Sequence, residues 1–162
     1  MAQPTQPPQA QPGSVVDPYR NYNFKVVIQS VVQGHFTRVD GLGVKIDRVL
    51  WREGGENASV RVLPGQPEFT PVSLRYGLTD STELIRWLFR AIGGKVERRN
   101  VSLAMLDASG TAEVRRWNLI GAWPCEWFGA PLDALGKELA IESLSLAYDK
   151  LELDDAPTAP VA

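Results

Sequence analysis

The stretch NVSLAMLDASGTAEVRRWNLI, residues 100–120, contains two apolar-rich segments separated by the short turn Ala108-Ser109-Gly110. The segments Asn100–Asp107 and Glu113–Ile120 each have the length of an ordinary strand. Two such segments joined by a few residues that include glycine predict an antiparallel β-hairpin. This hairpin makes a mainly β protein the first expectation.

The two-residue period of β-strands continues on both sides of the hairpin. Phe24, Val26 and Ile28 stand at alternate positions, which is typical of a half-buried strand. The same pattern predicts strands over residues 36–39, 44–51, 60–63, 72–76 and 137–153. We expect the 60–63 strand to end at Pro64-Gly65, and a helix is the alternative for 137–153 because helix-forming residues are frequent there.

One segment has a helical pattern instead. The run Asp80-Ser81-Thr82-Glu83 resembles a capping box, and it precedes apolar residues at helical spacing: Leu84, Ile85, Leu88, Phe89 and Ile92. Gly93-Gly94 is a natural C-terminal stop. One helix over about residues 80–92 among seven or eight strands predicts a β-sandwich or barrel with the helix packed on one side.

The two ends of the chain have a different composition. Residues 1–18 are rich in proline and glutamine and contain one charge, Asp17, so we expect a disordered arm. Residues 154–162 have the same character, and we expect a disordered tail there. The folded β-domain is therefore predicted to span residues 19–153.

Composition argues against several classes of function. The 162 residues include 17 Lys and Arg against 19 Asp and Glu, and this slightly acidic balance disfavours sequence-specific nucleic-acid binding and stable membrane association. No apolar run is long enough to span a bilayer. The N-terminus lacks the features of a secretory signal, so we expect synthesis and retention in a reducing cytoplasm.

Few residues could carry chemistry. The single histidine, His35, and the single cysteine, Cys125, predict neither a metal site nor a catalytic pair. The loop Gly129–Lys137 resembles a phosphate-binding loop only faintly, because its glycines have the wrong spacing. We therefore expect no enzyme activity, no cofactor and no metal.

Two regions are candidate subunit contacts. Trp123 and Trp127, near Trp117, are expected in a loop after the hairpin, where core packing and a subunit interface are both open. The polar loop Trp51–Asn57 is either a mobile connection or an ordered arm at the tip of a long hairpin that docks on a neighbour. The candidate interface residues are Trp51, Arg52, Glu53, Gly54, Gly55, Glu56, Trp123 and Trp127.

Six pieces of the chain, in order, resemble one protein family. They are DPYRNYNF at 17–24, FTRVDGLG at 36–43, WREGGE at 51–56 with LPG at 63–65, GLTDS at 77–81, AWP at 122–124 with Trp127, and ELAIESLSL at 138–146. This set resembles the inner-tube proteins of contractile phage tails and of related contractile injection systems. The resemblance covers about residues 17–153.

The resemblance implies a β-barrel-like subunit that forms hexameric rings. It further implies that rings stack into a hollow tube inside a contractile sheath, on a baseplate, with tube-initiator and tube-terminator proteins as partners and a payload in the lumen. The particle would be made in a bacterial cytoplasm, as a phage tail or as a contractile injection particle. The alternatives are a baseplate-proximal initiator paralogue and a monomeric secreted effector or ligand-binding β-domain.

Overall fold

The computed structural model describes residues 21–29, 36–52, 60–78 and 81–154. These residues form nine strands and one helix, so the predicted mainly β fold is confirmed. The elements are β1 (Phe24–Ile28), β2 (Phe36–Asp40), β3 (Gly43–Trp51), β4 (Arg61–Thr70), β5 (Val72–Gly77), α1 (Glu83–Ile92), β6 (Arg99–Leu106), β7 (Glu113–Phe128), β8 (Ile141–Ala147) and β9 (Lys150–Asp154). The predicted arm, 1–18, lies outside the described residues, as does the predicted tail apart from Asp154.

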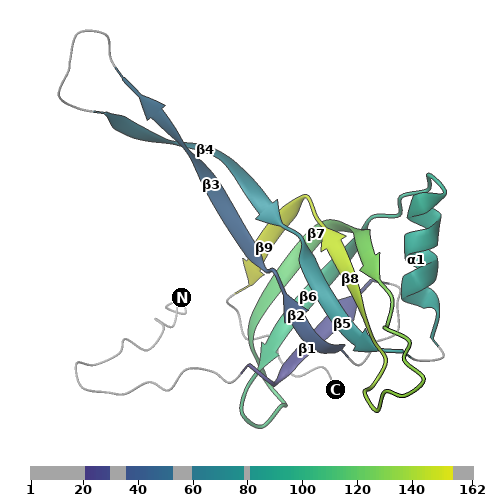
Figure 1. Ribbon diagram of the computed structural model, residues 1–162. Coiled ribbons are helices and arrows are strands. Elements are labelled where there is room, and N and C mark those ends of the chain that lie inside the picture. Colours follow the sequence, from purple (N-terminus) through teal and green to yellow (C-terminus); the bar gives the residue numbers. More distant parts are fainter. Residues whose placement is uncertain (1–20, 30–35, 53–59, 79–80, 155–162) are drawn as a thin grey trace.

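Seven strands form a curled antiparallel sheet: six follow the order β1-β6-β7-β8-β5-β2, and β9 joins by pairing with β7 (Figure 1). The long strand β7 pairs with β6 along one edge, and β8 and then β9 pair with its other edge. Alternate side chains point inward, as the two-residue period predicts. The fully buried members of this core are Val72, Leu74, Trp87, Val101, Leu119, Ala122, Leu144 and Leu146.

The predicted strand over 137–153 is two strands, β8 and β9, separated at Tyr148 and Asp149. The prediction that it starts at residue 137 is wrong, because residues 137–140 are in no strand. The interruption lies beside Gly121, where β7 adopts a left-handed conformation with φ of 68°. The amide of Asp149 donates to the carbonyl of Ile120 at 3.0 Å, and the Asp149 carboxylate pairs with Arg98. The alternation was therefore predicted correctly, but the break depends on backbone geometry that side-chain pattern does not encode.

Strands β3 and β4 form a separate two-stranded sheet, called the hairpin below, that projects from the body (Figure 1). The prediction that the second strand ends at Pro64-Gly65 is wrong, because β4 continues to Thr70. Proline fits there because each strand of the hairpin has one edge without a partner strand among the described residues. The pairing of β3 with β4 shifts register between Ile46 and Arg48, which lie opposite Pro67 and Pro64.

Helix α1 begins at Glu83 rather than near residue 80, and it packs against β7. Thr82 precedes the first turn without a side-chain capping bond, and Asp80 lies outside the described residues. The buried residues are Trp87 and Leu88, whereas Phe89 and Ile92, expected on the apolar face, are exposed. Within the described residues, no helix has the length and apolar character needed to cross a membrane.

Candidate assembly surfaces

The hairpin exposes apolar side chains on both of its faces. Every residue of β3 after Gly43 is exposed, and the cross-strand pairs Val49–Leu63 and Leu50–Val62 lie on opposite faces. A two-stranded sheet is at best marginally stable alone in water. An exposed apolar surface of this kind is typical of a protein–protein contact.

The attachment of the hairpin to the body depends on a glycine. Gly41 links β2 to β3 with φ of 85°, and a Cβ atom there would overlap the backbone carbonyl of Pro71. Pro71 in turn links β4 to β5. The two connections can therefore lie side by side only because residue 41 has no side chain.

The candidate interface residues of the hairpin tip are only partly described. Trp51 pairs with Arg61 across the last rung of the ladder and is 54% exposed, and Arg52 follows it, also exposed. The other tip candidates, Glu53, Gly54, Gly55 and Glu56, lie outside the described residues. The structure thus places Trp51 and Arg52 at the far end of a projecting hairpin, as the arm interpretation requires.

Trp123 and Trp127 lie on strand β7, so the prediction of a loop after the hairpin is wrong. Trp123 is half-buried opposite Ala147, and Trp127 lies opposite Leu144 with its ring against Gly129. Pro124 and the irregular register beside it concealed the continuation of the strand in the sequence. The structure does not bring these tryptophans to the hairpin tip.

A further apolar surface was not predicted from the sequence. Residues 129–140, called the leucine loop below, connect β7 to β8 without helix or strand. They expose Leu132, Leu135 and Leu139 to 93%, 92% and 84%. The available signal was three leucines at i, i+3 and i+7 in a segment whose Pro131 and Gly136 disfavour a helix.

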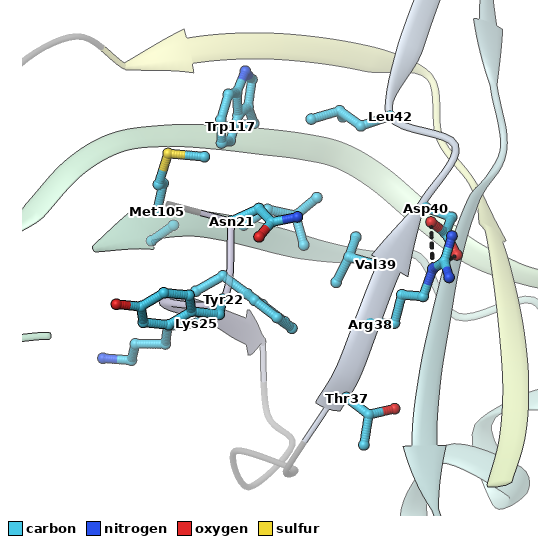
Figure 2. Close-up of a pocket in the computed structure, with 13 residues that line it drawn as sticks. Asn21, Tyr22, Lys25, Thr37, Arg38, Val39, Asp40, Leu42, Met105 and Trp117 are labelled. Carbon is cyan, nitrogen blue, oxygen red and sulfur yellow. Dashed lines mark hydrogen bonds and ion pairs between the residues drawn. The ribbon is translucent and has the colours of Figure 1, made fainter. Parts of the chain in front are cut away.

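A groove of about 620 Å³ lies between strands β1 and β2, the two ends of the sheet order (Figure 2). In Figure 2, Val39, Met105 and Trp117 face this space from three strands, and Leu42 faces it from the connection between β2 and β3. Arg38 donates to Asp40 at 2.8 Å on its rim. Since β1 and β2 are not paired with each other among the described residues, the barrel-like sheet is open here.

The described residues contain no cluster of His, Cys, Asp and Glu suited to a metal ion. Burial, reinforced by Glu126, raises the pKa of the Cys125 thiol, which opposes the thiolate form that a nucleophile needs. His35 lies outside the described residues. The exposed apolar surfaces described above are typical of protein contacts.

Comparison with known proteins assigns the family. The family model of the T4-like virus tail tube protein gp19 matches residues 20–152. The chain belongs to this tail tube family. The match includes the hairpin, the helix and all nine strands except the last two residues of β9.

Solved structures agree with the tail tube assignment. A chain of the PVC sheath–tube complex, an extracellular contractile injection system in its extended state, is 26% identical, with a TM-score of 0.77 over 86% of this chain and 93% of that one. The anti-feeding prophage cap, a tube-terminating cap, is 23% identical, with a TM-score of 0.78 over 90% and 97%.

More distant chains share the fold alone. Hcp1 from Flavobacterium johnsoniae is 13% identical to the tail tube protein, with a TM-score of 0.53 over 85% of this chain and 98% of that one. The search of curated proteins found no match. The predicted β-sandwich or barrel-like tail-tube fold is therefore confirmed at the level of the single subunit.

Proposed function

We propose that this tail tube protein is the repeating subunit of the inner tube of a contractile particle. Hexameric rings of the chain stack into a hollow conduit inside a contractile sheath, on a baseplate, and the lumen carries the payload. The observation that carries the proposal is the projecting hairpin, whose apolar side chains beyond Phe69 are exposed among the described residues. The chain that carries this hairpin belongs to a family of tube proteins.

The role is structural and non-catalytic, and it needs no cofactor. The PVC relative of 26% identity comes from a structure that contains both sheath and tube, and a second PVC structure of the same identity contains a sheath/tube terminator. By likeness, sheath, baseplate, initiator and terminator proteins are the partners of this chain. The particle is assembled in a bacterial cytoplasm, as a phage tail or as an injection system.

The test is immunogold electron microscopy on the high-speed pellet of cells that make the particle, with an antibody against this chain. Gold along thin tubes that protrude from contracted sheaths is the expected result. Gold confined to the baseplate end would assign the chain to an initiator ring instead. A chain that stays in the supernatant as a monomer, while such particles are present, would overturn the tube proposal and favour the effector or ligand-binding alternative.

A further inference from the structure

Two exposed apolar surfaces, the hairpin and the leucine loop, lie at opposite ends of the described domain (Figure 1). We propose that they are the two halves of one interface, in which the hairpin of one copy packs on the leucine loop of a second copy. This inference rests on the proposed function, since it names the contact that joins tube subunits.

Strand β5 separates the two surfaces within one copy. It begins at Val72, next to the foot of the hairpin, and ends at Gly77, which pairs with Ile141 at the end of the leucine loop. The amide of Leu78 then donates to the carbonyl of Ala140 at 2.9 Å. Six strand residues span roughly 17 Å.

The hairpin cannot reach the leucine loop of its own chain. It leaves the body at the Val72 end of β5 and extends away from the sheet for the nine residues of β3, roughly 27 Å (Figure 1). The surface that it covers therefore belongs to another molecule. A second copy is available at every position of a tube, and it presents the complementary end.

One face of the hairpin matches the leucine loop in chemistry. Leu50 and Val62 are opposite each other on this face, and Arg48 shares it two residues away. Lys45 and Asp47 pair with each other at 3.1 Å, whereas the Arg48 side chain has no ion pair or hydrogen bond with another described residue. The face is therefore an apolar patch beside an unpaired cation.

The leucine loop has the opposite charge. Its turn is held by Asp133, whose carboxylate accepts the Leu135 amide at 3.0 Å and whose carbonyl accepts the Gly136 amide at 3.2 Å. Glu138, beside Leu139, has no ion pair with another described residue. The loop contains two carboxylates, Asp133 and Glu138, and one lysine, Lys137, so its net charge is negative.

Contact between different surfaces of identical chains is heterologous, and it repeats from copy to copy. It closes into a ring or continues as a stack, and both arrangements occur in a tube of rings. Burying the leucines against the Leu50–Val62 face of the hairpin removes the leucine patch and this one face from water with a single contact. Arg48 and Glu138 then align the two surfaces.

The test uses engineered cysteines in particles purified from producing cells. In a Cys125→Ala background, which removes the native thiol, Leu50→Cys and Leu135→Cys are combined in one chain and the particles are mildly oxidised. We expect a ladder of disulfide-linked multimers on a non-reducing gel. Each single variant should give no ladder, because residue 50 meets residue 135 and not a second residue 50.

A matched control pairs Leu50→Cys with Phe89→Cys, which lies on the exposed side of helix α1, and should give no ladder. Intact tubes without a ladder from the first pair would overturn this inference and leave the proposed function standing. Cross-linking of residue 50 to a different protein would also overturn it. Absence of wild-type tubes would overturn both.

Charge reversal provides a second readout should the cysteine chains fail to assemble. Arg48→Glu should lower the yield of tubes at least tenfold, and adding Glu138→Arg should restore it. Both residues are exposed, so the monomer should remain folded by circular dichroism. A double variant as defective as Arg48→Glu would contradict the pairing of these surfaces.

Discussion

Gly41 is the residue on which the placement of the hairpin depends. Its φ of 85° is strained for any other residue, and an added Cβ would overlap the Pro71 backbone, which cannot rotate away. Gly41→Ala should lower the free energy of unfolding by roughly 3 kcal/mol. Urea denaturation measures this loss at a protein concentration too low for assembly.

Gly110→Ala is the matched control. Gly110 also has a positive φ, 75°, but an added Cβ would meet no atom within 4 Å. This change should cost only about 1–2 kcal/mol. Equal losses for the two variants would show that close approach to Pro71 does not constrain the foot of the hairpin.

Tyr76 introduces a dependence of stability on alkaline pH. Burial, and then the negative charge of Glu142, raise the pKa of Tyr76 to about 12. The unfolded chain loses this proton near pH 10, so from about pH 10 to 12 the folded state binds more protons than the unfolded state. Titration of Tyr76 therefore leaves the free energy of unfolding unchanged below pH 10 and lowers it by roughly 2–3 kcal/mol as the pH rises through 12.

Tyr76→Phe should remove this part of the pH dependence. The buried Tyr76 hydroxyl has no hydrogen-bond partner, so the variant should have nearly unchanged stability at pH 7. Urea unfolding of both proteins at pH 8 to 12 measures the difference, and comparing them cancels the titration of other groups. Parallel curves over the whole range would contradict the assignment.

At the scale of the element, helix α1 is attached to the body through Trp87. This side chain is fully buried, its indole nitrogen donates to the carbonyl of Glu97 at 2.8 Å, and the Arg99 guanidinium lies 5.1 Å from the ring centre. Trp87→Ala should lower the free energy of unfolding by about 3–5 kcal/mol. Phe89→Ala, on the exposed side of the same helix, should change it by less than about 0.5 kcal/mol.

Chemical denaturation of the two helix variants gives the comparison directly. A small loss for Trp87→Ala would mean that the helix is not docked through this residue. A large loss for Phe89→Ala in the monomer would mean that its exposed side is in fact packed.

The hairpin should matter for assembly and little for folding of the monomer. Arg52→Ala combined with Glu53→Ala alters the tip, and we expect it to block tube formation while circular dichroism remains unchanged. Lys45→Ala with Asp47→Ala removes an exposed charge pair near the foot and should leave assembly intact, because such pairs contribute little. Tubes of normal length from the Arg52/Glu53 variant, seen by negative-stain microscopy, would exclude the tip as a docking element.

The sequence predicted elements where side-chain alternation and burial coincide. Strands β1, β2, β5 and β6 lie within a few residues of their expected positions because each has one face on the core. Strand β3 also lies where alternation predicted it, although it projects from the core and is exposed on both faces. Side-chain alternation failed to predict strand ends that depend on the backbone. It ended a strand at Pro64, which lies inside β4, and it missed the break at Tyr148 between β8 and β9. It also missed Trp87, which lies beside the leucine stripe of the helix rather than in it.

The candidate surfaces were predicted unevenly for a related reason. Trp51 and Arg52 were expected at a hairpin tip and lie there, because a glycine-rich polar loop between strands is a strong turn signal. The leucine loop was missed because isolated apolar residues in a sequence are normally assigned to a core. Only the three-dimensional structure shows that Leu132, Leu135 and Leu139 are exposed and do not pack on the core formed by the described residues.

At the scale of the whole molecule, the subunit is a sheet-and-helix body with three surfaces that lack a partner among the described residues. The open groove between β1 and β2, the projecting hairpin and the leucine loop are all surfaces that a neighbour can complete. Assembly protects sheet edges that are otherwise prone to aggregation. The family assignment and this anatomy support the same account, in which the chain acts as one repeat of a tube.

Electron cryomicroscopy of tubes from purified particles tests that account most directly. The account predicts rings of six copies, each with density that fits this fold, repeated along the tube and joined by the hairpin of one copy against a neighbouring copy. Tube density that fits another protein, with this chain absent from the repeat or confined to a single terminal ring, would contradict it.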